Sequence, residues 1–353
     1  MNSQTTEPSI AESRERLLYF DIFRGMAILA VIGIHVLGSL LPHLWNVTFR
    51  WKLIATINTL LQFAVPAFLM LSALLLTRSL LRQYSLPRYA TSRLLQTVPP
   101  FLIWSGIYLL LPENRQDFTS MELVGRVLIG KASFHLYFLF VLLQLYVLIP
   151  LLLPVWRKRP SFLLFLLSTI MLTMAVYWSN RLFFRFQLLA SIVLWYLPSV
   201  ALGMWLGSQA ERIPQILKRG AVGAGIVAVF SGAYFVSLSL ASLRHIRPDT
   251  FHYQVSGWLY FASMGFLLLF VAEYGSARKV RTDWLVALGR NSMPIYIAHP
   301  LVLYYMKQLY HAETLKGIVL TILLYTLTTI GVPLFLAWLA SKLRLSALLF
   351  GRA

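Results

Sequence analysis

The sequence predicts an all-α protein, a bundle that crosses a membrane about ten times with helices of roughly 20 residues each. Of its 353 residues, 58% are hydrophobic and 12% are charged, whereas a soluble domain has about twice that charged fraction. The net charge of +19 comes from lysine and arginine residues in short loops between apolar runs. That placement is typical of topology signals and of contacts with anionic lipids, so we expect a lipid bilayer and no nucleic acid as partner.

Taken in order, residues 1–16 are polar and are predicted to form a disordered cytoplasmic tail. A single membrane domain is expected over residues 17–345, followed by a cytoplasmic tail over residues 346–353. No internal repeat is visible, which argues against transporter folds that are built from repeats. The spans are predicted near residues 18–41, 53–77, 92–111, 135–155, 161–179, 187–207, 221–242, 255–274, 285–308 and 316–341.

Loop charge predicts the orientation of these spans. With the N-terminus in the cytoplasm, the cytoplasmic segments carry eighteen lysine and arginine residues and the outer segments carry eleven. Because cytoplasmic loops of membrane proteins are enriched in these residues, the count favours a bundle with both termini in the cytoplasm. An even number of spans requires the same arrangement.

The first span carries three ionisable groups that a bilayer interior disfavours, namely Asp21, Arg24 and His35. Arg24 and His35 are eleven residues apart, which places them on one face of a helix and about 16 Å apart along its axis. An ionisable residue inside a span is a candidate functional residue, and a neutral imidazole can act as a general base. Alternatively, Asp21 pairs with Arg24 near the membrane surface, and His35 is a packed core histidine.

Four arginines lie between the second and third spans: Arg78, Arg82, Arg88 and Arg93. They match the general excess of positive charge in cytoplasmic loops, and guanidinium groups also suit the capture of phosphate. If a phosphorylated carrier binds here, its other end could reach an imidazole about 16 Å deeper. Coenzyme A has that form, with phosphates at one end and a thioester at the other.

A late segment, residues 288–303, is interrupted by Pro294 and Pro300. Proline frees backbone carbonyls within a span, and such an interruption is tolerated only where protein or water satisfies those groups. His299 lies about as far into its span as His35 lies into the first one, so the two imidazoles are expected at a common level. Alternatively, His299 is only a polar residue that packs against the kink.

The absence of cysteine narrows the possible chemistry. It excludes disulfides, thiolate metal sites and an acyl-cysteine intermediate. The seven histidines show no HExxH motif or tight ligand spacing, so no metal site is expected. No permanently bound cofactor is predicted either.

Six segments carry a resemblance to a known family. They are DIFRGMAILAVIGIH (21–35), VPAFLMLSALLL (65–76), PRYATSRLLQTVPP (87–100), HLYFLFVLLQLYVLIP (135–150), LPSVALGMWLG (197–207) and LGRNSMPIYIAH (288–299). In this order, and with ten spans, they resemble the acyltransferase-3 family of integral membrane acyltransferases over most of the chain. The departures are Ala73, where the family usually has glycine, Tyr137, where it usually has tryptophan, and a sparser basic loop.

The resemblance implies an enzyme that transfers an acyl group, usually acetyl, from cytoplasmic acyl-coenzyme A. The implied acceptor is a hydroxyl of an extracytoplasmic glycan, lipid-linked sugar or related molecule, as in the O-acetylation of a polysaccharide. By resemblance, Arg24 and His35 fall on the family's essential Arg–His pair, and Arg88 and Arg93 fall on its basic loop. A position in the plasma membrane is likewise implied.

We therefore predict a multi-pass plasma-membrane acyltransferase with acetyl-coenzyme A as co-substrate. Two mechanisms stay open: direct transfer of the acyl group to the acceptor, or transfer through an acyl-histidine. A transporter or flippase of lipid-linked sugars or acylated glycans would also explain a polar seam through the bundle. A scaffold in an envelope-synthesis complex, in which the polar residues merely pack, is the third alternative. The predicted residues are Asp21, Arg24 and His35 for catalysis, with His35 as general base; Arg82, Arg88 and Arg93 for coenzyme A; and Ser72, His135, Asn291 and His299 for the acceptor substrate.

Overall fold

The computed structural model describes residues 10–44, 48–111, 120–186, 188–278, 280–309 and 315–351. Within these ranges the chain is helical and contains no strand, which confirms the predicted all-α class. Residues 1–9 of the predicted N-terminal tail lie outside the described residues. The α-helices are α1 (Ile10–Leu40), α2 (Phe49–Leu61), α3 (Ala64–Arg82), α4 (Leu86–Leu109), α5 (Ser120–Leu128), α6 (Tyr137–Arg157), α7 (Phe162–Ser179), α8 (Leu197–Ser208), α9 (Ile213–Leu243), α10 (Thr250–Ala277), α11 (Asp283–Arg290), α12 (Ser292–Leu309), α13 (Leu315–Lys342) and α14 (Ser346–Phe350).

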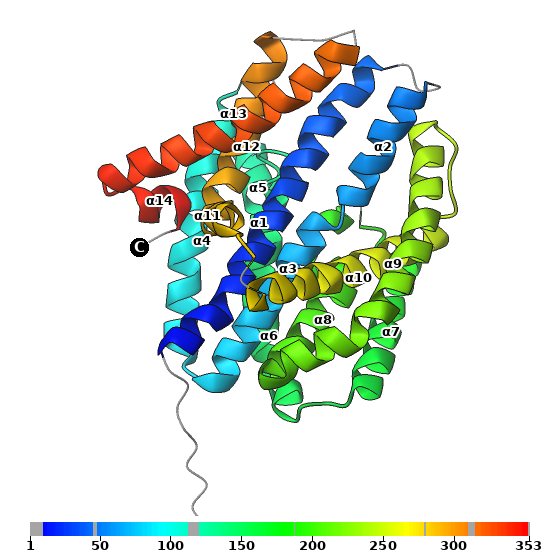
Figure 1. The fold of residues 1–353 in the computed structure, drawn as a ribbon, viewed down its shortest axis with the longest axis vertical. Helices are drawn as coiled ribbons and strands as arrows, with labels where there is room; N and C mark the ends of the chain where they lie inside the picture. The colour runs from blue at the N-terminus through cyan, green and yellow to red at the C-terminus, as the bar shows by residue number, and fades with distance from the viewer. Residues whose placement is uncertain are drawn as a thin grey trace, which may run out of the picture.

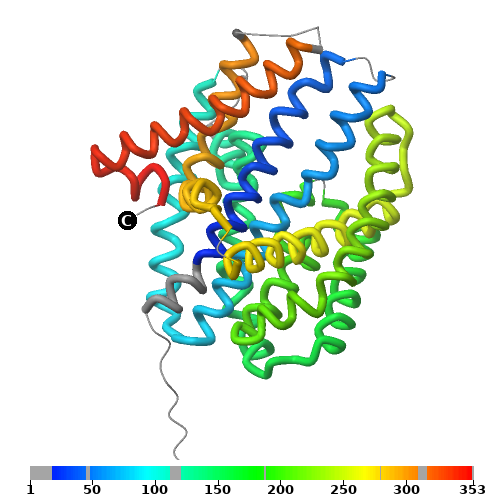
Figure 2. Tube along the Cα trace, in the orientation of Figure 1, coloured from blue at the N-terminus to red at the C-terminus, as the bar shows by residue number. Residues whose placement is uncertain are grey.

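Helix α1 runs through the middle of the bundle, as Figures 1 and 2 show. It packs against α2, α3, α10, α11, α12 and α13. Helices α7, α8, α9 and α10 gather on one side, where α8 and α10 join them to α3. On the other side lie α13 and α14, with α14 against α4. The polar residues of α1 are therefore surrounded by helices from both halves of the chain.

Seven helical segments among the described residues are long and apolar enough to cross a membrane. They are Leu18–His43, Phe49–Arg82, Tyr137–Arg157, Phe162–Phe184, Ala210–Leu243, Thr250–Ala277 and Lys316–Lys342. A shorter apolar segment covers Val193–Ser208. This chain is thus a multi-pass membrane protein, while the total of ten spans and the cytoplasmic position of both termini remain predictions.

Three of the ten predicted spans are not among these seven segments. The span at 92–111 falls in α4, whose apolar character is diluted by polar and proline residues in its first half. The span at 187–207 is divided between 3₁₀ turns and the twelve-residue helix α8. The span at 285–308 is broken at Asn291, where α11 ends and α12 begins. The breaks follow proline and polar residues, which interrupt the helical hydrogen-bond ladder or lower the hydropathy.

Two glycines allow α11 to lie directly against α1. A Cβ atom on Gly25 of α1 would overlap the carbonyl oxygen of Leu285, and one on Gly289 of α11 would overlap the carbonyl oxygen of Asp21. A larger residue at either position would force the two helices apart. The close approach also brings Arg290, the residue after Gly289, beside Asp21 of α1.

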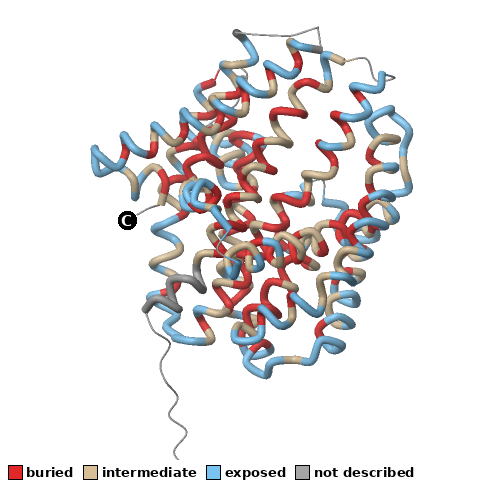
Figure 3. The backbone as a smooth tube through the Cα atoms, in the orientation of Figure 1, coloured by how far each residue is buried: buried red, intermediate tan, exposed pale blue. Residues whose placement is uncertain are grey.

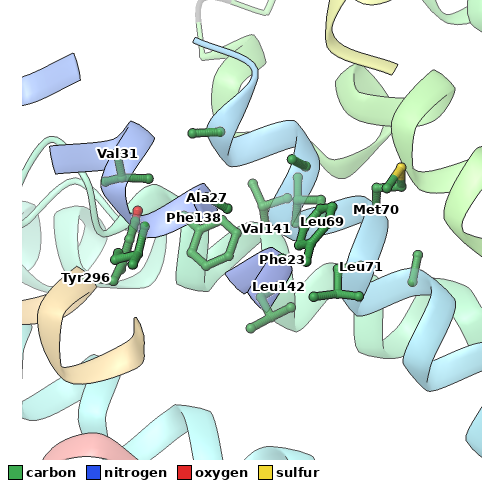
Figure 4. Close-up of a cluster of buried hydrophobic side chains, with 14 of the residues drawn as sticks. Phe23, Ala27, Val31, Leu69, Met70, Leu71, Phe138, Val141, Leu142 and Tyr296 are labelled. Atoms are coloured by element: carbon green, nitrogen blue, oxygen red, sulfur yellow. The ribbon is translucent and has the colours of Figure 1, made fainter. Parts of the chain in front are cut away.

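Buried residues gather in the middle of the bundle (Figure 3). Figure 4 shows part of this core, where α1, α3, α6 and α12 meet. Lipid tails are as apolar as these side chains, so close packing rather than removal from water holds the helices together. The labelled core residues are Phe23, Ala27 and Val31 of α1, Leu69, Met70 and Leu71 of α3, Phe138, Val141 and Leu142 of α6, and Tyr296 of α12.

The segment predicted as a C-terminal tail contains a packed helix, α14. The indole of Trp104 in α4 donates a hydrogen bond to the carbonyl oxygen of Leu349 at 2.9 Å. Phe350 is 2% exposed and contacts the same indole, with 6.1 Å between ring centroids. Residues 346–350 therefore pack against α4, mainly through Phe350 and the backbone of Leu349.

Candidate active site

Asp21 and Arg24 of α1 form an ionic cluster with α11. The guanidinium of Arg24 donates to Asp21 Oδ1 at 2.9 Å, and Arg290 Nε donates to Asp21 Oδ2 at 3.1 Å. The Asp21 side chain is 17% exposed, against 34% for Arg24 and 64% for Arg290. One largely buried carboxylate is shared by two guanidinium groups, so this cluster of three side chains keeps a net positive charge.

Arg290 is a site residue that the sequence analysis missed. It lies inside the LGRNSMPIYIAH segment, but nothing in the sequence connects it with Asp21, 269 positions away. The Asp21–Arg24 pair, by contrast, has the i, i+3 spacing that brings side chains together on a helix. The contact with Arg290 depends on Gly25 and Gly289, which let α11 approach α1.

Farther along α1, His35 faces His299 of α12, with 5.1 Å between the ring centroids. Helix geometry places His35 about 16 Å from Arg24 along the axis. The ring of Phe134 lies 5.0 Å from that of His35. His35 is half-buried and makes no hydrogen bond with the residues that the structure describes. Its ring nitrogens are therefore not committed to another described side chain or backbone group.

The neighbouring imidazole of His299 is held in one tautomer by its own helix. Its Nδ1 lies 3.0 Å from the carbonyl oxygen of Ile295 and 2.8 Å from that of Tyr296. Carbonyl oxygens only accept hydrogen bonds, so we assign the hydrogen to Nδ1. Pro300 has no N–H to donate to the Tyr296 carbonyl, and the His299 ring takes its place. His299 Nε2 is buried and has no hydrogen-bond partner among the described residues.

Next to Pro300, a tyrosine hydroxyl is inserted into the backbone ladder of α12. Tyr108 of α4 donates to the carbonyl oxygen of Ile297 at 2.7 Å and accepts from the N–H of Leu301 at 3.2 Å. These two backbone groups would bond each other in a regular helix. Such an insertion is a known cause of helix bending. Tyr108 carried no signal in the sequence, although Pro300 predicted that donors would be needed nearby.

His135 supports the same part of α12. Its Nε2 lies 3.3 Å from the carbonyl oxygen of Ile297, and its Nδ1 lies 3.2 Å from Ser133 Oγ. The hydroxyl of Tyr296 donates to the His135 carbonyl at 2.6 Å. The His135 ring is 5.9 Å from that of His299. With both nitrogens occupied, His135 holds α12 in place beside the His35–His299 pair, and its predicted contact with substrate stays a prediction.

The three arginines predicted to bind coenzyme A lie at the junction of α3 and α4. Arg82 and Arg88 are exposed, whereas Arg93 is half-buried. Arg93 donates to Gln96 Oε1 at 3.2 Å, and its buried Nε has no partner among the described residues. Within those residues, no hydrogen bond or ion pair joins the three arginines to the Asp21 cluster.

The structure does not bring Ser72 or Asn291 into hydrogen-bonding contact with the histidine pair. Ser72 is half-buried on α3 and forms no hydrogen bond with a described residue. Asn291 ends α11, where its side chain donates to the carbonyl oxygen of Ala287 at 2.8 Å. Among the described residues, no group of three or more histidine, aspartate or glutamate side chains is arranged to hold a metal ion. The two predicted substrate contacts remain untested.

The fold and the site together define a class of protein, a multi-pass membrane protein with ionisable side chains inside its helical bundle. The family model described as an acyltransferase domain matches residues 17–338, nearly the whole chain. The chain therefore belongs to the acyltransferase-3 family, and the matched region contains both the Asp21 cluster and the His35–His299 pair. No curated protein and no solved structure matched the chain.

Proposed function

We propose that this protein is an O-acyltransferase of the plasma membrane. The donor is cytoplasmic acyl-coenzyme A, with acetyl as the acyl group, and the acceptor is a hydroxyl of an extracytoplasmic glycan or lipid-linked sugar. One observation carries the proposal: two imidazoles, His35 and His299, lie 5.1 Å apart inside the matched acyltransferase region.

His35 is the general base of the proposed reaction. It is half-buried, whereas His299 is fully buried, so His35 is the imidazole that an acceptor hydroxyl can approach. Neutral imidazole removes the hydroxyl proton while the oxygen attacks the carbonyl carbon of the thioester. The carbon–sulfur bond then breaks, and the departing thiolate takes the proton from the imidazolium. The new ester forms without an acyl-enzyme, and His35 returns to its neutral form.

His299 orients the acceptor hydroxyl. Because its hydrogen is on Nδ1 and bonded to backbone carbonyls, its Nε2 can accept a hydrogen bond from a second hydroxyl of the sugar but cannot donate one to an oxyanion. This assigns His299 to positioning rather than to oxyanion stabilisation. With the neighbouring hydroxyl bound to His299, the attacking hydroxyl would direct its lone pair at the thioester and its proton at His35.

The phosphates of coenzyme A are assigned to Arg82, Arg88 and Arg93. One guanidinium group can donate two parallel hydrogen bonds to the oxygens of a phosphate. The buried Nε of Arg93 is a donor that makes no hydrogen bond with a described residue. Arg24, held by Asp21, supplies further positive charge at the entrance to the bundle. The distance of about 16 Å between Arg24 and His35 suits an extended carrier with its thioester at the far end.

The proposal is tested by mass spectrometry of envelope glycans from cells that lack the protein or carry it as wild type, His35→Ala or His252→Ala. His252 is an exposed histidine on α10 and serves as the matched control. We expect the mass of one esterified glycan to be found only in cells that carry the protein. It should be absent with His35→Ala, although this variant is as abundant in the membrane as wild type, and present with His252→Ala. Persistence of the ester with His35→Ala would refute His35 as the base.

A second measurement separates the enzyme from a flippase. Acetyl-coenzyme A should raise the melting temperature of the purified full-length protein, and less so for Arg88→Ala or Arg93→Ala. Arg344→Ala, an exposed arginine after α13, is the control and should respond as wild type does. A flippase that makes no use of coenzyme A would show no shift in any of these proteins.

A further inference from the structure

Away from the histidine pair, α7, α8, α9 and α10 enclose an apolar cavity of about 910 Å³. Its lining runs along α7 from Phe162 to Met174, which is about 18 Å of helix. One leaflet of the hydrocarbon core is about 15 Å thick, half of the roughly 30 Å core. Leu166 and Ile170, which line the cavity, are 38% and 51% exposed, so it opens to the outer surface of the bundle. The cavity thus has the length and the chemistry of a groove for one acyl chain.

At one end of this cavity lies a polar pocket of about 520 Å³. Three arginines line it, Arg159, Arg212 and Arg219, together with polar side chains such as Ser161. None of the three arginines forms an ion pair with a carboxylate in the part of the chain that the structure describes. Glu211, the neighbour of Arg212 in sequence, does not line the pocket. The pocket therefore carries uncompensated positive charge.

The two cavities form one continuous site, because Phe162, Trp205, Ile216 and Arg219 line both. Trp205 marks the boundary between them. Its indole N–H donates to the carbonyl oxygen of Pro160 at 3.2 Å on the polar side, while its ring stacks on Phe165 at 5.3 Å on the apolar side. A positive end and an apolar groove thus meet at one fixed side chain.

We propose that this combined site binds one anionic phospholipid of the bilayer. Its phosphate lies among Arg159, Arg212 and Arg219, and one acyl chain lies along the groove between α7 and α10. One guanidinium group can donate two parallel hydrogen bonds to the oxygens of a phosphate, and it is only weakly hydrated. Both properties suit the binding of a lipid phosphate at the membrane surface. A water-soluble phosphate would leave the groove without an apolar partner, and a neutral lipid would leave the arginines without a counter-charge. The site is separate from the proposed acyl-transfer residues and does not depend on their function.

The test uses native mass spectrometry of the detergent-purified full-length protein, titrated with phosphatidylglycerol or with phosphatidylcholine of the same chains. Two variants disable the two halves of the site. Arg212→Gln combined with Arg219→Gln removes charge, and Gly223→Leu fills the groove, where a Cβ atom on Gly223 meets no atom within 4 Å. The matched controls are Arg344→Gln and Gly275→Leu, the latter at another open glycine outside the groove.

We expect wild type to bind one phosphatidylglycerol more tightly than phosphatidylcholine, and each disabling variant to lose about tenfold or more in that affinity. The controls should bind as wild type does, and melting temperatures should show that every variant is folded. Equal binding of both lipids, or unchanged binding by Gly223→Leu, would overturn the proposal. So would full displacement of the lipid by inorganic phosphate or by acetyl-coenzyme A, because either result assigns the arginines to a soluble ligand.

Discussion

The centre of the bundle and the group formed by α7, α8, α9 and α10 differ in how some of their buried hydroxyls and ring nitrogens are paired. Around α12, the hydroxyls of Tyr108 and Tyr296 and both nitrogens of His135 have hydrogen-bond partners. In α7, the hydroxyls of Thr173 and Tyr177 are buried and have no partner among the described residues. Among the described residues, the first region is a polar network in which His299 Nε2 is buried and unpaired, and the second contains an apolar groove.

The difference shows in which region of the protein the positions of polar side chains are fixed. A buried polar group without a partner costs about 1–3 kcal/mol, so a network whose members are almost all paired holds its side chains in one arrangement. The unpaired nitrogen of His299 is therefore a candidate ligand contact within a rigid frame. The groove needs no such precision, because an acyl chain is bound by shape and apolar contact. Four substitutions test this contrast, in order of decreasing expected effect.

The largest effect is expected from His299→Phe, which keeps a ring in place but removes both nitrogens. If His299 positions the acceptor, transfer should fall about 100-fold, the cost of a misplaced reactant. Stabilisation by acetyl-coenzyme A should be retained, since the arginines assigned to its phosphates are left unchanged. The assay is transfer in proteoliposomes with His252→Phe as control. Unchanged transfer would remove His299 from the site.

Next, Gly289→Ala should separate α11 from α1, because its Cβ atom would overlap the carbonyl oxygen of Asp21. Overpacking of this kind costs about 1–3 kcal/mol, and it would also draw Arg290 away from Asp21. The melting temperature of the purified protein measures the effect. Gly275→Ala, where a Cβ atom meets no atom within 4 Å, should leave it unchanged. Equal melting temperatures would contradict the tight α1–α11 contact.

A smaller loss of about 1–2 kcal/mol is expected from Tyr108→Phe, which removes the hydroxyl that bridges Ile297 and Leu301. The two backbone groups lose their shared partner beside Pro300, and α12 should shift near His299. Melting temperature and transfer rate should therefore both decrease. The matched control is Tyr304→Phe, because no hydrogen bond of the Tyr304 hydroxyl to a described residue is present. If the variant behaves as wild type does, the Ile297 carbonyl and the Leu301 N–H can bond each other without the tyrosine hydroxyl.

The smallest effect is expected in the apolar group of helices. Thr173→Val replaces a buried hydroxyl without a partner by a methyl group, and such a change should be neutral or slightly stabilising. Thr329→Val, in α13, removes a buried hydroxyl that donates to the carbonyl oxygen of Tyr325 and should cost about 0.5–1.5 kcal/mol. Comparison of the two melting temperatures checks the contrast. A larger loss for Thr173→Val would mean that its hydroxyl has a partner after all.

Several features of the site follow from local sequence. Asp21 and Arg24 are three residues apart on one helix and pair as that spacing predicts. The interruption at Pro300 indicated that backbone carbonyls would need other donors, and the His299 ring and the Tyr108 hydroxyl supply them. The positions of Arg290 and Tyr108 could not be predicted, because each meets its partner only when distant helices pack.

The sequence by itself determined that this chain is an all-α, multi-pass membrane protein of the acyltransferase-3 family, because run length, charge placement and motif order are properties of neighbouring residues. Only the tertiary structure decided that His35 meets His299, that Arg290 shares Asp21, and that an arginine-lined pocket opens into an apolar groove. These contacts join residues from helices far apart in the chain. They depend on how closely the helices approach, which the glycines at the contacts and the packing of the surrounding side chains decide.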